Sequence, residues 1–125
     1  MNDATSTREF TDAERTLILW MLDHGESEAQ QFLPQFERAR VTSQRCLCGC
    51  ASIHFSVEGQ SAPVGGFHLL ADFVFGGEAD LSGIFVYEQG GVLSGLEVYG
   101  LAGDAPRTLP TPDMLRSSPF ATAST

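Results

Sequence analysis

Residues 83–101 read GIFVYEQGGVLSGLEVYGL and carry the strongest fold signal in the chain. Two apolar runs meet at Gly90-Gly91, and a two-residue hairpin loop needs positive φ, which glycine adopts without steric cost. The stretch therefore predicts an antiparallel hairpin with these two glycines as its loop. The register that follows pairs Gln89 with Val92, Tyr87 with Ser94, Val86 with Gly95, Phe85 with Leu96 and Ile84 with Glu97.

Two stretches upstream alternate with the period of a β-strand, which predicts one face on the core and one face away from it. In ASIHFSVE the predicted core face consists of Ala51, Ile53, Phe55 and Val57. In FHLLADFVF it consists of Phe67, Leu69, Ala71, Phe73 and Phe75.

The N-terminal part has helical rather than strand periodicity. Thr11 followed by Glu14 is typical of a capping box, and Gly25 is a suitable helix stop. A second capping box is predicted at residues 27–30, SEAQ, and Pro34 is expected to end or kink the helix that follows. Two short N-terminal helices are therefore predicted.

This order of elements predicts an α+β fold, with two N-terminal helices followed by an antiparallel sheet of about four to five strands. The sheet is expected to be a meander that contains the Gly-Gly hairpin. The length of 125 residues and the hydrophobic fraction of 42% fit a single domain, predicted over residues 1–116. Residues 117–125, rich in serine and threonine, are predicted to form a disordered tail.

The charge of the chain bears on its partners. The net charge is −9, all seven basic residues are arginines, and residues 46–106 contain neither lysine nor arginine. Such a surface repels phosphate, which predicts that neither nucleic acid nor an anionic membrane is a partner.

Residues 1–10 lack a signal-peptide pattern, and the longest apolar run, LILWML, has six residues. We therefore expect a cytoplasmic protein, and the arginine bias suggests bacterial origin.

RCLCGCASIHFSV, residues 45–57, holds all three cysteines, Cys46, Cys48 and Cys50, together with His54. Strand periodicity places these four side chains on one face, like a row of metal ligands. Residues two apart on a strand are separated by about 6.6 Å, however, whereas thiolates on one zinc ion lie roughly 3.8 Å apart. A shared metal therefore requires a bend, for which Gly49 is the suitable residue.

Three interpretations of the cysteines follow. Reduced, buried strand residues are favoured, because free cysteine is among the most buried residue types. A zinc site would use two or three of the cysteines with His54 or His68, but zinc modules carry cysteine pairs in two places. A thiol redox site would lack the usual CxxC spacing.

Other candidate groups are scattered. The carboxylates that could form an acid–base pair or bind a hard cation are those of Asp72, Glu78, Asp80 and Glu97. Acidic side chains of this kind are usually solvated edge or loop residues. No nucleophile motif or phosphate-binding loop accompanies them, so no catalytic residue is predicted.

Three segments together resemble a group of small uncharacterised bacterial proteins: RCLCGCAS at 45–52, LSGLEVY at 93–99 and the proline-bearing stretch through Leu115. The likeness rests on an RCxCGC strand motif and an LExY element in the following hairpin, and it covers roughly residues 38–115. In that group the hairpin usually has an Asp-Gly type turn, which Gly90-Gly91 replaces here. The group has no assigned activity, so the resemblance implies fold and bacterial origin and transfers no catalytic residue.

The sequence thus predicts a cytoplasmic binding or interaction domain without enzymatic activity or cofactor. It could form a homodimer or lend its apolar hairpin to a partner as an edge strand. The alternative is a metal-binding or thiol-dependent protein that uses Cys46, Cys48 and Cys50 with His54, with zinc as the metal.

Overall fold

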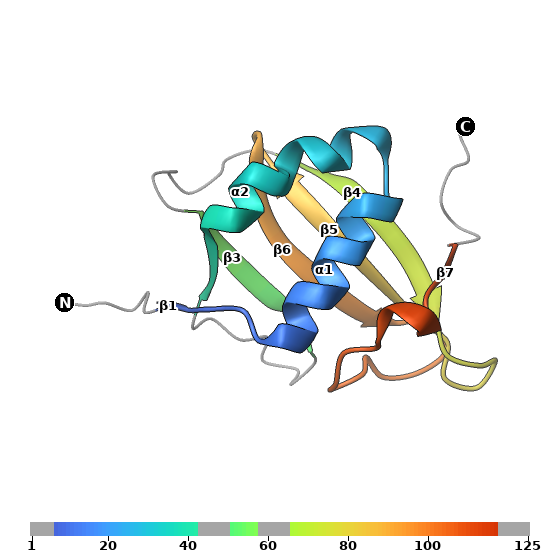
Figure 1. The fold of residues 1–125 in the computed structure, drawn as a ribbon. Helices are drawn as coiled ribbons and strands as arrows, with labels where there is room; N and C mark the ends of the chain where they lie inside the picture. Colours follow the sequence, from blue (N-terminus) through green and yellow to red (C-terminus); the bar gives the residue numbers. More distant parts are fainter. Residues whose placement is uncertain (1–6, 43–50, 58–65, 118–125) are drawn as a thin grey trace.

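The computed structural model describes residues 7–42, 51–57 and 66–117. These residues form an antiparallel β-sheet with helices along one of its faces (Figure 1). The strands are β1 (Thr7–Arg8), β2 (Ala39–Thr42), β3 (Ile53–Val57), β4 (Phe67–Phe75), β5 (Ser82–Gln89), β6 (Val92–Gly100) and β7 (Arg116–Ser117), and the helices are α1 (Asp12–His24), the 3₁₀ helix η1 (Ser27–Phe32), α2 (Leu33–Arg38) and the 3₁₀ helix η2 (Pro112–Met114). The predicted α+β class is confirmed.

The described part of the sheet has seven strands, in the order β1-β2-β3-β6-β5-β4-β7. The predicted count of four to five strands was too low, because β1 and β7 have only two residues each and are too short to show alternation. Consecutive strands are antiparallel neighbours in β1-β2-β3 and in β4-β5-β6, and the predicted meander is broken between β3 and β4. Strand β3 pairs with β6 instead of β4, so the β5–β6 hairpin lies in the middle of the sheet.

Helix α1 begins as predicted. The Glu14 backbone N–H donates to Thr11 Oγ1 at 3.1 Å, and the Thr11 N–H donates to Glu14 Oε1 at 2.9 Å, which completes the capping box. Leu17, Ile18 and Met21 are fully buried against the sheet. The helix ends at His24, and Gly25 follows as its C-terminal cap. The backbone N–H of the next residue, Glu26, donates a hydrogen bond to Leu70 O at 2.8 Å.

The second helical region differs from its prediction. Ser27 does not cap a helix, because residues 27–32 form a 3₁₀ helix whose N-terminal flanking residue is Glu26 and which has no side-chain cap. Pro34 neither ends nor kinks the α-helix that follows. It lies in the first turn of α2, where its missing N–H costs no helical hydrogen bond.

One continuous core lies between the helices and the sheet. Its fully buried members include Leu22, Ala29 and Phe36 from the helical layer. Leu70, Ile84, Val86, Leu93 and Leu96 supply the sheet side of this core. On β3, the alternation is as predicted, with Phe55 and Val57 buried and Ser56 exposed.

The predicted hairpin loop is confirmed, but of the residue pairs predicted for its two strands only Gln89 with Val92 is correct. Gly90 and Gly91 have φ values of 58° and 87°, and Gln89 pairs with Val92 as expected. Beyond that pair, Ser94 is an extra residue in β6. The observed pairs are Glu88 with Leu93, Tyr87 with Gly95, Val86 with Leu96, Phe85 with Glu97 and Ile84 with Val98. The predicted pairs were therefore wrong by one residue, because a β-bulge interrupts the ladder.

A second bulge changes the faces of β4. Leu70 is an extra residue between Leu69, which pairs with Tyr87, and Ala71, which pairs with Val86. Leu70 itself is fully buried in the core. The prediction of one apolar face from Phe67 to Phe75 was therefore wrong, since the residues before the bulge lie on the opposite face from Ala71.

The domain boundary stays a prediction. Ser117 belongs to β7, where it pairs with Phe73. The remainder of the predicted tail, residues 118–125, lies outside the described residues.

Candidate functional site

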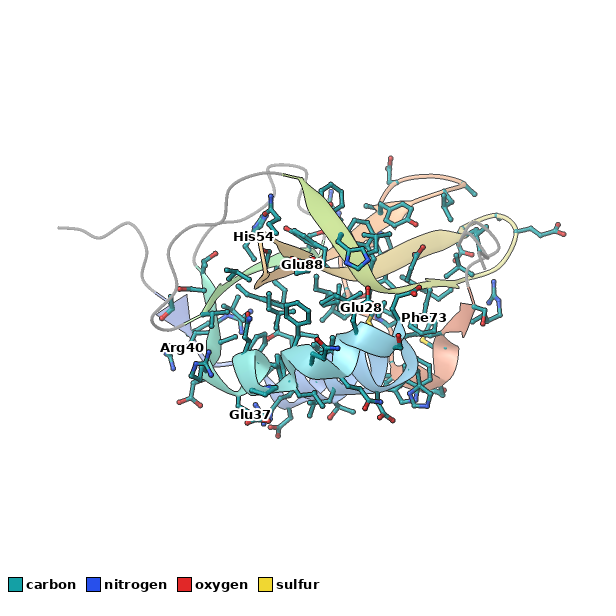
Figure 2. The ribbon with its side chains drawn as sticks, turned by 90° about the horizontal axis from the view of Figure 1, so that it is seen from above. Glu28, Glu37, Arg40, His54, Phe73 and Glu88 are labelled. Carbon is teal, nitrogen blue, oxygen red and sulfur yellow. The ribbon has the colours of Figure 1, made fainter. Side chains whose placement is uncertain are left out.

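The face of the sheet opposite the helices carries the candidate site, and we call it the outer face. Figure 2 shows the helices along one side of the sheet, with His54 directed away from them. No described helix covers this face. Its residues, assigned from strand register and alternation, include His54 from β3, Phe67, Leu69 and Asp72 from β4, Phe85 and Tyr87 from β5, and Glu97 and Tyr99 from β6.

Four rings on this face form one aromatic cluster, consisting of Phe67, Phe85, Tyr87 and Tyr99. Phe85 is central, with ring centroids 6.1 Å from Phe67 and 5.7 Å from both Tyr87 and Tyr99. Phe67 and Tyr87 meet edge to face at 5.4 Å. Phe67 is 58% exposed, an unusual exposure for a large apolar ring at the edge of a packed cluster.

Two glycines set the orientation of the tyrosine rings. A Cβ atom at Gly83 would lie 2.1 Å from Tyr99 Cζ, and one at Gly95 would lie 2.8 Å from the Tyr87 hydroxyl. Each ring therefore lies against the backbone of the neighbouring strand. Because glycine leaves this space open, the tyrosines extend the aromatic cluster across three strands.

Two carboxylates flank the central ring. Asp72 on β4 and Glu97 on β6 both pair with Phe85, one from each side. Asp72 Oδ1 is buried without a hydrogen-bond partner among the described residues. Burial, with a smaller contribution from Glu26, raises the pKa of Asp72.

The same two carboxylates also affect the pKa values of the tyrosine side chains. Burial and the nearby Asp72 carboxylate raise the pKa of Tyr99. Burial and the Glu97 carboxylate raise the pKa of Tyr87. Each acid therefore lies close to one ring of the aromatic cluster, and the site has two acid–tyrosine pairs around Phe85.

Of the four residues Cys46, Cys48, Cys50 and His54 predicted to form a metal site, His54 falls on described residues. It pairs with Gly95 at the margin of the aromatic cluster, and its Nδ1 is buried without a hydrogen-bond partner in the described part of the chain. Cys46, Cys48 and Cys50 lie outside the described residues. Over residues 7–42, 51–57 and 66–117, no three His, Cys, Asp or Glu side chains are grouped to hold a metal ion. The zinc hypothesis is therefore untested.

His68, the alternative histidine ligand, lies elsewhere, between two carboxylates. Its Nε2 is 3.1 Å from Glu28 Oε2 and its Nδ1 is 3.3 Å from Glu88 Oε2. Glu88 also accepts a hydrogen bond from the Gly91 N–H at 2.8 Å. This group connects η1 to the hairpin, which gives it a structural role.

The acids that could have formed a pair divide into two sets. Asp72 and Glu97 belong to the outer face, whereas Glu78 and Asp80 lie in the loop between β4 and β5. Asp80 Oδ1 accepts a hydrogen bond from the Gly77 N–H at 2.7 Å and so closes this turn.

Two surface hollows lie away from the aromatic cluster. One, of about 460 Å³, is lined by charged residues near the start of α1, where Arg15 pairs with Glu37 at 3.2 Å and Arg40 with Glu9 at 3.8 Å. The other, of about 280 Å³, lies between the end of β4 and the segment that includes Leu109. In the first hollow the opposite charges offset each other, so it has no strong preference for an ionic ligand.

Comparisons with known proteins add no assignment, because no family model, no curated protein and no solved structure matches this chain. The resemblance to uncharacterised bacterial proteins thus stays a prediction. Among the described helices, none combines the length and apolar character needed to cross a membrane.

Proposed function

We propose that this chain is a binding domain without catalytic activity and that its outer face receives an extended segment of a partner protein. The observation that carries the proposal is the aromatic cluster on a sheet face that no described helix covers. Aromatic side chains combine a large contact area with few rotatable bonds, and they are enriched among the residues that dominate binding energy.

The central position of the hairpin changes where a partner would bind. Both β5 and β6 are paired on each side, so the predicted donation of an edge strand by this hairpin is wrong. The described edge strands β1 and β7 offer only two residues each. A partner segment is therefore better accommodated across the face than along these edges.

The rigidity of the aromatic cluster favours binding. Tyr87 and Tyr99 are held against the backbone at Gly95 and Gly83, and Phe85 contacts both rings. Side chains that are already ordered lose little conformational entropy when a partner arrives. The outer face thus offers a preformed surface.

Selection of peptides by phage display against the full chain tests this proposal. We expect selected peptides to perturb the amide NMR signals of β4, β5 and β6 and to lose affinity on Phe85→Ala. Met114→Ala is the matched control, because Met114 is an exposed apolar residue (45%) outside the outer face. Thermal unfolding of both variants verifies that they fold. Peptides that perturb the helical layer instead, or that bind both variants equally, would contradict the proposal.

A further inference from the structure

The outer face has negative charge for which the described residues provide no counter-ion. Neither Asp72 nor Glu97 forms an ion pair with any residue that the structure describes. Strands β3 to β6 contain no lysine or arginine. Arg116 on the neighbouring β7 donates to Gly76 O at 3.0 Å. Within residues 7–42, 51–57 and 66–117, no ion pair supplies a positive group to these carboxylates, which leaves them available to a positive group of another molecule.

Asp72 indicates more specifically that the partner supplies a hydrogen-bond donor. Its Oδ1 is buried and lacks a donor in the described part of the chain, although a buried carboxylate oxygen is costly without one. Glu14, the acid at the start of α1, shows the usual arrangement, with two hydrogen bonds from Arg8 at 2.9 and 2.8 Å. Asp72 has the acceptor of such a pair, and no described residue supplies its donor.

The surrounding aromatic rings indicate which kind of positively charged group would bind beside the two carboxylates. A cation is attracted to the face of an aromatic ring, and Phe85, Tyr87 and Tyr99 adjoin the two carboxylates. A guanidinium group is planar, stacks on rings and donates paired N–H groups to a carboxylate. An ammonium group is a compact point charge that stacks less well.

We infer that the outer face recognises an arginine side chain of the partner segment, with the guanidinium group over the ring of Phe85 and its N–H groups directed to Asp72. This inference rests on the proposed function and specifies the partner. A second copy of the chain fits less well, because apposed outer faces would bring unpaired carboxylates of two copies together.

An NMR titration of the isotope-labelled full chain tests the inference. The probe is acetyl-Gly-Gly-Arg-Gly-Gly-amide, and the comparison is the same peptide with citrulline, which keeps the shape of arginine without its charge. We expect the arginine peptide to shift the amide signals of Gly83 and Gly95, which lie next to the tyrosine rings. The citrulline peptide should bind at least about fivefold more weakly, since one cation–π contact is worth about that factor.

Two double variants separate a specific site from general attraction. Asp72→Asn with Glu97→Gln removes the carboxylates of the outer face. Asp23→Asn with Glu37→Gln removes the same two residue types from the exposed surface of the helical layer. We expect the first pair to weaken arginine binding about fivefold or more and the second to leave it nearly unchanged.

The outcomes distinguish this inference from the proposed function. Equal binding of the citrulline peptide, or equal weakening in both double variants, would overturn the arginine assignment. If phage display selects peptides without arginine that still bind at β4, β5 and β6, the arginine inference fails and the proposed function stands. If the selected peptides bind at the helical layer, both fail.

Discussion

The ring of Tyr99 lies over Gly83 of the neighbouring strand, so closely that a Cβ atom at residue 83 would come within 2.1 Å of Tyr99 Cζ. Gly83→Ala must therefore displace the ring. Because the contact is with the movable end of a side chain, we expect the free energy of unfolding to change by less than about 1 kcal/mol. Affinity for a peptide selected on the wild type should fall, and isothermal titration calorimetry measures this change.

Gly25 provides a contrasting prediction. A Cβ atom there would lie 2.3 Å from the Leu70 carbonyl oxygen and 2.7 Å from Ala71 Cβ, so β4 itself would have to move. We expect Gly25→Ala to lower the free energy of unfolding by about 2 to 3 kcal/mol in urea titrations. A smaller loss than that of Gly83→Ala would show that α1 and β4 are less tightly packed than described.

Asp72 should make the protein less stable at neutral pH. Its pKa is raised in the folded state, so the folded protein binds this proton more tightly than the unfolded chain does. The ionised group therefore opposes folding above the raised pKa, and stability is regained as the pH falls through that value toward the ordinary pKa of 3.8. We expect Asp72→Asn to raise the midpoint of thermal unfolding at pH 7, with a smaller gain at pH 4. Destabilisation by Asp72→Asn at pH 7 would contradict this account.

The ion pair of Arg8 and Glu14 should give the free energy of unfolding the opposite pH dependence. Burial alone would raise the pKa of Glu14, but hydrogen bonds from Arg8 and Thr11 outweigh it and lower the pKa. The resulting stability is present above the ordinary pKa of 4.5 and is lost as the pH falls through the lowered pKa of the folded state. We expect Arg8→Ala to cost about 1 to 2 kcal/mol at pH 7. Chemical denaturation at pH 7 and pH 3 should show a smaller cost at the lower pH.

The cysteine hypotheses require a separate measurement. If Cys46, Cys48 and Cys50 are reduced core residues, native mass spectrometry of protein purified without chelator should show no bound metal. Alkylation should then require unfolding. Stoichiometric zinc that is lost when all three cysteines are replaced by serine would favour the metal-binding alternative. Light scattering on the same sample tests the homodimer prediction, which a strictly monomeric particle at high protein concentration would contradict.

The sequence allowed the local features of the fold to be predicted. The capping box at Thr11 and Glu14 and the hairpin loop at Gly90 both depend on interactions within a few residues, and both were correct. The pattern also showed that His54 faces away from the core.

The bulges could not be predicted in this way. Leu69 and Leu70 are both apolar, so alternation does not show which of them is the extra residue, and only packing against the helices buries Leu70. Ser94 donates to Val92 O at 2.7 Å, an interaction that any serine can make. Because the two bulges lie on either side of Tyr87, the outer face became visible only when the strands were paired.

A crystal structure of the full chain with a peptide selected by phage display would test the central claim most directly. We predict that the peptide lies across β4, β5 and β6, with an arginine guanidinium over the Phe85 ring and hydrogen-bonded to Asp72. A peptide bound to the helical layer, or paired along an edge of the sheet with the aromatic cluster left open, would contradict the claim.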